Sequence, residues 1–95
     1  MAAYVIGEIE VTDPATYEDY RKQVLAVVTK YGGKFIARGG KVETLEGGPP
    51  ARRVVVLEFP SLEQAQKWYR SAEYAPLIAL RQSASRGRII VDEGV

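Results

Sequence analysis

The segment 52–59, RRVVVLEF, constrains the fold more than any other part of the sequence. Three consecutive valines followed by a leucine are typical of a β-strand that is buried on both faces. Alternation along a strand divides its side chains between two faces, with Arg53, Val55, Leu57 and Phe59 on one and Val54, Val56 and Glu58 on the other. Such a strand belongs in the middle of a sheet, so the rest of the chain must supply neighbouring strands and a covering layer.

A first helix is expected before this strand. Asp13 can cap a helix that begins at Pro14, since proline has no amide to satisfy there and a φ already suited to a helix. The helix should end near Tyr31, because the glycine pair 32–33 accepts the left-handed backbone that ends helices. Its apolar residues recur at helical spacing and form one buried stripe: Tyr17, Tyr20, Val24, Val27, Val28 and Tyr31.

A second helix is expected directly after the central strand. Pro60 ends the strand, and Ser61 with Gln64 three residues later matches a capping box. The apolar spacing predicts that this helix breaks around 71–73 and continues through 74–85, where leucines and an isoleucine recur. The second half of the chain therefore contributes one interrupted helix.

Three further segments are strand-like. Residues 3–11 alternate between two faces, residues 34–46 are expected to form a strand, a sharp bend at Gly39-Gly40 and a second strand, and residues 86–92 form a short final strand. The resulting order is typical of an α+β, ferredoxin-like βαββαβ fold: a four-stranded antiparallel sheet with two helices on one face, as a single domain over residues 1–95. The other face has apolar residues but no helix. A second copy is expected to cover it, giving a homodimer through the open sheet face.

Composition excludes several kinds of site. The 95 residues include no cysteine and no histidine, which rules out disulfides, zinc fingers, cysteine-ligated iron–sulfur clusters, a Ser-His-Asp triad and a histidine-ligated haem. Carboxylate spacing predicts no metal site, and no cofactor is expected. A balance of 13 basic and 12 acidic residues lacks the basic excess of nucleic-acid-binding domains. No apolar run approaches the roughly 18 residues of a membrane span, and the start is unlike a secretory signal, so a cytoplasmic protein is expected.

Four segments of the sequence resemble the bacterial domain-of-unknown-function family 1330: AYVIGEIEVTDPATYEDYR, YGGKFIARGG, VVVLEFPS and AQKWYRSAEYAPLIALR. The likeness covers nearly the whole chain, and YGGKFIARGG and WYRSAEYAPLIALR carry it most specifically. The family is similar to the dimeric α/β barrel superfamily, which includes antibiotic-biosynthesis-type monooxygenases, haem-degrading enzymes and muconolactone isomerase-like proteins. The resemblance implies a ferredoxin-like dimer but no activity. The haem-degrading branch is disfavoured, since its histidine ligand is missing here.

The resemblance also implies a cavity between the sheet and the helices of each protomer. The residues expected to line it and bind a ligand are Tyr4, Arg38, Trp68, Tyr69, Tyr74, Arg81 and Ser85. A guanidinium among aromatic side chains can bind a carboxylate or an enolate through two parallel hydrogen bonds, and tyrosine hydroxyls can donate to the same oxygens. The candidates for catalysis are Arg81, Tyr69 and Glu58, the last as a base whose pKa burial would raise.

Each candidate also has a purely structural interpretation. Trp68 and Tyr69 could belong to the core or to the dimer interface, and Glu58 could form an ion pair. Arg81 could pair with Glu58 or with another carboxylate, Glu73, and Arg38 could hold the bend that follows it or reach across the dimer.

Two functions therefore stay open at this point. One is a protein that binds, or a cofactorless enzyme that acts on, a small anionic or aromatic metabolite. The alternative is a non-catalytic dimeric interaction module, in which the polar residues serve packing and assembly.

Overall fold

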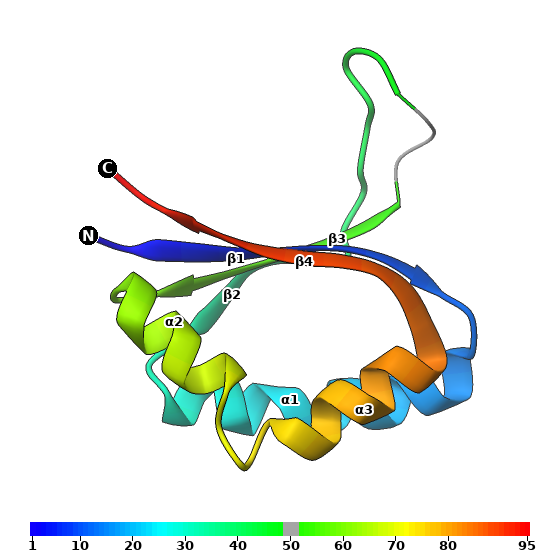
Figure 1. Ribbon diagram of the computed structural model, residues 1–95. Helices are drawn as coiled ribbons and strands as arrows, with labels where there is room; N and C mark the ends of the chain where they lie inside the picture. The colour runs from blue at the N-terminus through cyan, green and yellow to red at the C-terminus, as the bar shows by residue number, and fades with distance from the viewer. Residues whose placement is uncertain (49–51) are drawn as a thin grey trace.

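The computed structural model describes residues 1–48 and 52–95 and confirms the predicted order of elements. The elements are β1 (Ala3–Val11), α1 (Pro14–Lys30), β2 (Lys34–Arg38), β3 (Arg53–Phe59), α2 (Leu62–Tyr69), α3 (Ala75–Ala84) and β4 (Ser85–Glu93). The four strands form one antiparallel sheet in the order β2-β3-β1-β4. The helices lie together on one face of this sheet, as predicted, and the N- and C-termini lie close together (Figure 1).

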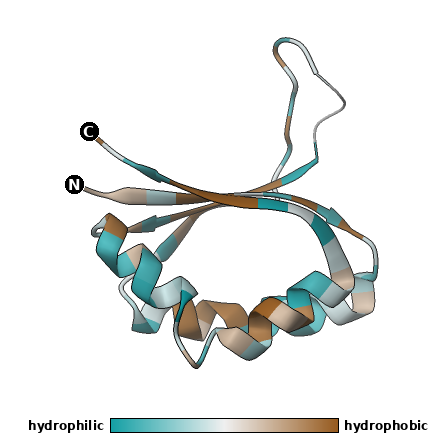
Figure 2. Cartoon of the chain, in the orientation of Figure 1, coloured by the Kyte–Doolittle hydropathy of each residue, from teal (hydrophilic) through white to brown (hydrophobic). Residues whose placement is uncertain are grey.

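The central position of β3 is confirmed, since it pairs with β2 on one side and β1 on the other. Figure 2 shows that hydrophobic residues are concentrated in the middle of the sheet. The helix-facing residues of β1 and β3 pack against α1, α2 and α3 to form the core, whose members include Val5, Ile9, Tyr17, Val24, Val28, Leu57, Phe59, Trp68, Tyr74 and Leu77.

Side-chain caps fix where the helices begin. The carboxylate of Asp13 accepts from the Thr16 amide at 3.2 Å, and the hydroxyl of Ser61 accepts from the Gln64 amide at 3.1 Å. The predicted capping box is only half formed, because the Gln64 side chain donates to the carbonyl of Tyr31 at 2.9 Å and not to Ser61. Gln64 therefore joins the start of α2 to the end of α1.

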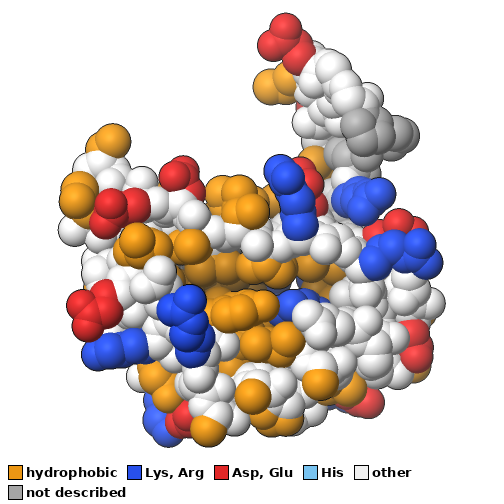
Figure 3. Space-filling model, viewed as in Figure 1, with side chains coloured by type: hydrophobic (Ala, Val, Ile, Leu, Met, Phe, Trp, Pro, Cys, Tyr) orange, Lys and Arg blue, Asp and Glu red, His pale blue; other side chains and the backbone are white. Residues whose placement is uncertain are grey.

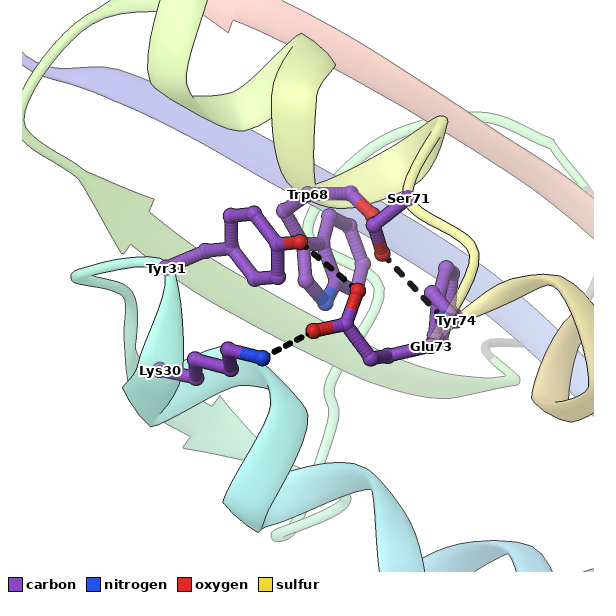
Figure 4. Close-up of polar contacts among 6 residues, drawn as sticks. All are labelled: Lys30, Tyr31, Trp68, Ser71, Glu73 and Tyr74. Carbon is purple, nitrogen blue, oxygen red and sulfur yellow. Dashed lines mark hydrogen bonds and ion pairs between the residues drawn. The ribbon is translucent and has the colours of Figure 1, made fainter.

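The predicted break between α2 and α3 is confirmed, and Ser71 holds it. This buried hydroxyl donates to the carbonyl of Trp68 at 2.8 Å and accepts from the amide of Tyr74 at 3.1 Å. Glu73, in the same turn, accepts from Tyr31 at 2.8 Å and forms an ion pair with Lys30 at the end of α1 (Figure 4). The turn is thus fastened on both sides, which fixes the aromatic rings on either side of it.

The predicted strand over residues 41–46 is wrong. Residues 39–48 leave the sheet and project from the face opposite the helices (Figure 1). The chain turns outward at Gly39, whose φ of +76° is in the left-handed region that glycine favours. The pairing of β2 with β3 is interrupted earlier, by a β-bulge or irregularity between Phe35 and Ala37. Leu45, on the projecting segment, is 92% exposed.

The face of the sheet away from the helices, the open face, carries an apolar row across neighbouring strands. Ile90, Ile6 and Val56 are paired in register across β4, β1 and β3. Ion pairs lie in the rows on either side, joining Lys34 to Glu58 at 3.2 Å and Arg88 to Glu8 at 3.5 Å. No helix covers this row, and Ile90 is 45% exposed.

Candidate functional site

A cavity lies between the sheet and the helices, beneath one row of the sheet. The row runs from Arg38 through Val55 and Gly7 to Ile89, so a glycine stands near its middle. Because Gly7 has no side chain, the side chain of Ile89 packs over it, and a Cβ there would lie 2.9 Å from Ile89 Cδ1. The centre of a water molecule can move through about 40 Å³ of this cavity, which is room for a few waters.

The most unusual group in this cavity is the guanidinium of Arg81, on α3. The residue is only 6% exposed, and its Nη1 donates to the hydroxyl of Tyr74 at 2.8 Å. The Tyr74 hydroxyl in turn lies 2.7 Å from that of Tyr20, which comes from α1. No acidic side chain among the described residues is within ion-pair distance of Arg81. A buried cation is thus held by neutral hydroxyls alone.

Aromatic rings form the wall beside this group. Trp68 stacks on Tyr74 with ring centroids 4.3 Å apart, and Tyr69 meets the same tyrosine edge-on at 5.8 Å. Trp68 is almost fully buried, whereas Tyr69 is 37% exposed. The buried indole Nε1 of Trp68 has no hydrogen-bond partner in the described part of the chain. The wall therefore offers flat apolar surface and one unused donor.

Burial keeps the hydroxyls of this site protonated. It raises the pKa of Tyr74 well above the ordinary value for a phenol, and it raises the pKa of Tyr20 in the same way. Burial acts to lower the pKa of Arg81, and Tyr74 and Tyr20 raise it, chiefly through the negative charge that their oxygens carry when ionised. At neutral pH both phenols are protonated, so the guanidinium keeps its burial penalty without that compensation, and the group of Arg81, Tyr74 and Tyr20 holds one positive charge together with neutral hydroxyls.

Two further hollows adjoin the cavity and share Ile89 with it. One, of about 240 Å³, runs between α2 and β4, and the other, of about 180 Å³, lies beside the end of α3. Six arginines line the three spaces: Arg21, Arg38, Arg53, Arg70, Arg81 and Arg86. None of the lining residues is acidic. Figure 3 shows the hollow beneath the sheet, with a basic side chain at its back.

Most of the predicted site residues come together here. Arg38, Trp68, Tyr74 and Arg81 line the cavity, and Tyr69 and Ser85 line the hollow beside Arg81. Arg38 does not reach out of the protomer but donates to a backbone carbonyl of α1 at 3.0 Å. Ser85 donates to the carbonyl of Arg81 at 2.7 Å and so closes the last turn of α3.

Two predicted residues lie on the open face instead. Tyr4 is opposite Glu58 and Asp92 in register, so its side chain is on the far side of the sheet from the cavity. Glu58 forms an ion pair with Lys34 at 3.2 Å, as its structural interpretation anticipated. Neither of the two pairings considered for Arg81 forms, since Glu73 is bound to Lys30 and Tyr31.

Four polar residues of the cavity were not among the predicted site residues: Tyr17, Tyr20, Arg21 and Arg53. Tyr17 and Tyr20 were assigned to the buried stripe of α1, where they do pack, but their rings also line the cavity. Arg53 carried a signal that could have identified it, because it shares the core face of β3 with Leu57 and Phe59. A charged residue on an apolar face is informative in this way.

Neither a metal site nor a membrane span is found in the described residues. In residues 1–48 and 52–95, no three acidic side chains gather in a way that could hold a metal ion. No helix in the same ranges has the length and apolar character needed to cross a membrane.

The fold is shared with several solved structures. A protein of unknown function from Rhodopseudomonas palustris superposes with a TM-score of 0.81 at 19% identity, over 99% of this chain and 82% of that one. SnoaB, a cofactor-independent oxygenase from Streptomyces nogalater, has a TM-score of 0.71 at 12% identity, over 99% and 93%. A putative antibiotic biosynthesis monooxygenase from Nitrosomonas europaea has a TM-score of 0.57 at 11% identity, over 99% and 90%. At these identities the likeness shows the fold alone, that of the ferredoxin-like dimeric α/β barrel proteins.

Sequence comparison gives the family. A search of curated proteins finds no match. The model of the family described as "Domain of unknown function (DUF1330)" matches residues 2–95, and the chain belongs to this family.

Proposed function

We propose that this protein binds a small anionic, partly aromatic metabolite in the cavity between its sheet and its helices, with Arg81 as the anchor for the anion. The observation that carries the proposal is a guanidinium only 6% exposed with no acidic partner among the described residues. Removing a charge from water costs several kcal/mol even after the protein relaxes. An anionic ligand would supply the missing counter-charge.

The neighbouring groups suit an anion as well. The hydroxyls of Tyr74 and Tyr20 stay protonated, and because one of them donates to the other, the pair has one proton left to donate to a ligand. A carboxylate or an enolate oxygen could accept from the guanidinium and a hydroxyl together, and such charge-assisted bonds are stronger than neutral ones. A phenol or enol bound beside Arg81 would also have its pKa lowered, which favours the anion.

The apolar body of the ligand would lie in the adjoining hollows. The space next to Arg81 is small, but the hollow of about 240 Å³ begins at Trp68 and Tyr69. Rings of this kind stack well on flat, conjugated molecules. Catalysis without a cofactor would use the same groups, with Arg81 stabilising an enolate and the half-exposed Tyr69 exchanging a proton. Glu58 takes no part, because it lies on the open face.

Native mass spectrometry of the freshly purified protein tests the proposal first. We expect extra small-molecule mass on the wild type, whose identity then follows from extraction and accurate mass measurement. Arg81→Met should lose this mass and should bind the identified compound at least about tenfold more weakly, since a charged hydrogen bond contributes roughly 1.5–3 kcal/mol. Arg52→Met is the matched control, because Arg52 is exposed and lines none of the three spaces. Equal affinity in Arg81→Met and the control would refute the site.

A second candidate function is a non-catalytic dimeric module, and the open face favours it. The row of Ile90, Ile6 and Val56 is uncovered in one protomer, and rows of this kind are buried when two sheets stack. We propose that a second copy covers it in either function. The segment 39–48 projects on the same side, so Leu45 would contact that second copy.

The oligomeric state tests the open face. Ile6→Asp puts a charge in the centre of the apolar row and should convert a dimer to monomers in sedimentation velocity. Leu25→Asp is the control, since this leucine is 47% exposed on α1, away from the open face. A wild type that sediments as a monomer would contradict the proposed dimer, and a dimer that both substitutions leave intact would place its interface elsewhere.

A further inference from the structure

Three arginines converge on the side of the cavity away from Arg81. Arg38 donates through Nη2 to the backbone carbonyl of Arg21 at 3.0 Å, and its guanidinium lies 4.2 Å from the centroid of the Phe35 ring. The guanidinium of Arg53 lies 5.4 Å from the centroid of Tyr17, one turn of α1 before Arg21. All three arginines line the cavity. We call this group the arginine cluster.

The arginine cluster holds more charge and more donors than the protein satisfies. Among the described residues, its only ion pair joins Arg21 to Glu18 at 3.0 Å, so two of its three guanidinium charges have no partner. The Nε atoms of Arg21 and Arg53 are both buried without an acceptor. A buried donor left without an acceptor is unfavourable, because it loses its hydrogen bonds to water and gains none in return. Two such donors on neighbouring side chains indicate a place where an acceptor binds.

The backbone around the cluster is shaped to hold Arg53. Gly39 has a φ of +76°, and a Cβ at this position would overlap the Arg53 guanidinium. Gly40, the next residue, has no heavy atom within 4 Å of the place where its Cβ would stand. The positive φ therefore favours glycine at position 39, and its bare backbone also leaves room for the Arg53 guanidinium, whereas nothing of this kind applies at Gly40.

A line of aromatic rings joins the cluster to Arg81. Arg53 lies against Tyr17, whose ring centroid is 5.6 Å from that of Tyr20. The ring of Tyr20 is 6.5 Å from that of Tyr74, which accepts from Arg81. The cavity follows the same direction, since its lining includes the residues at both ends. The two basic groups thus line the same cavity, with Tyr17 and Tyr20 between them.

We propose that the arginine cluster is a second oxyanion site, which takes a carboxylate or a phosphate, and that the ligand of this cavity carries an acidic group at each end. The proposal rests on the proposed function, because Arg81 holds the first of the two groups. Guanidinium groups match both kinds of oxyanion through paired hydrogen bonds. The middle of the ligand must be thin and flexible, because the cavity between the two groups has room for only a few waters.

Binding of matched acids to the whole protein tests this. The probes are succinate, adipate and suberate, each compared with the monocarboxylic acid of equal chain length, together with inorganic phosphate. Calorimetry would be done on wild type, Arg53→Gln, Arg81→Gln and the exposed control Arg52→Gln. At the best chain length we expect the dicarboxylate to bind at least about tenfold more tightly than the monocarboxylate. Arg53→Gln should abolish this advantage, whereas Arg52→Gln should keep it.

The outcomes separate the second site from the proposed function. If the dicarboxylate has no advantage at any length and phosphate does not bind, the second site is wrong. If Arg81→Gln nevertheless fails to bind the monocarboxylate that wild type binds, the proposed function is kept without the second site. If phosphate binding is lost in Arg53→Gln and unchanged in Arg81→Gln, the cluster is an oxyanion site, and if Arg81→Gln also keeps the wild-type affinity for the monocarboxylate, the role of Arg81 fails. Arg38→Gln should repeat the effect of Arg53→Gln, which guards against a variant that folds poorly.

Discussion

The guanidinium of Arg81 should lower the stability of the fold, and replacing it with methionine should reveal this. Transfer of a charged side chain from water to the interior costs several kcal/mol after relaxation. The hydrogen bond from Arg81 to the Tyr74 hydroxyl, at 2.8 Å, stabilises the folded state by about 1.5–3 kcal/mol and so offsets part of this cost. No carboxylate in the described residues forms an ion pair with Arg81 that would offset more of it. The balance is therefore unfavourable to the charged side chain.

Methionine removes the charge and leaves no neighbouring polar group without a hydrogen-bond partner. Its unbranched side chain adapts to irregular space, and the hydroxyl of Tyr74 keeps its contact with Tyr20 at 2.7 Å. We expect Arg81→Met to raise the free energy of unfolding by about 1–2 kcal/mol, in line with other buried charges replaced by apolar residues. For a domain of this size each kcal/mol raises Tm by about 4–8 °C. Tyr74→Phe should have the opposite effect. It should lower the free energy of unfolding by about 1–3 kcal/mol, because Arg81 and Tyr20 both lose a hydrogen-bond partner.

Urea unfolding followed by fluorescence measures both changes. The chain has a single tryptophan, Trp68, and it is 2% exposed, so its emission reports loss of the core. Protomer concentration must be held constant, because association would contribute to stability. The exposed control Arg52→Met should stay within about 0.5 kcal/mol of wild type. A loss of more than about 1 kcal/mol in Arg81→Met would mean that the guanidinium stabilises the fold, and the argument for an anion site would lose its basis.

Two further predictions concern the ends of the site. Hydrogen bonds from Lys30 and Tyr31 hold the pKa of Glu73 at about 2, below its ordinary 4.5, so its contribution to stability is present above pH 4.5 and is lost as the pH falls toward 2. In Glu73→Gln the free energy of unfolding should therefore fall less steeply at acid pH than in wild type, whereas Glu63→Gln should behave like wild type. Identical stability–pH curves for wild type and Glu73→Gln would count against the contact of Glu73 with Lys30 and Tyr31. Gly39→Ala should cost about 1–3 kcal/mol through its positive φ and displace Arg53, whereas Gly40→Ala should be nearly neutral. Equal Tm values for the two glycine variants would contradict this difference.

Much of the fold could be predicted because its signals are local. Alternation identified β1 and β3, and Asp13 and Ser61 marked the helix starts through hydrogen bonds that span only three residues. The prediction of a strand over residues 41–46 failed, because alternation of side chains does not show whether a partner strand is available. At Gly39 the chain turns away from β3, and the pattern that follows has nothing to pair with.

The site could be predicted only where helical spacing fixes which way a side chain points. Trp68 lies on the inner face of α2, where the period of the helix placed it, and Arg81 lies on the inner face of α3, where the family resemblance placed it. Strands are less informative when both faces are apolar, because alternation separates the faces without saying which one the helices cover. Glu58 was proposed as a buried base for this reason, yet it lies on the open face.

The net charge of +1 conceals a separation of charge that matters more for function than the total. The acidic residues of β1, β3 and β4 that alternate with the core positions all lie on the open face: Glu8, Glu10, Glu58 and Asp92. Arginines line the cavity on the other face, and no acidic residue joins them. Low-dielectric walls concentrate the field of such charges, so the interior is positive although the protein as a whole is nearly neutral. An anion is therefore drawn toward the cavity without attraction to the outer surface, and added salt should weaken its binding only modestly, since charges held inside are poorly screened.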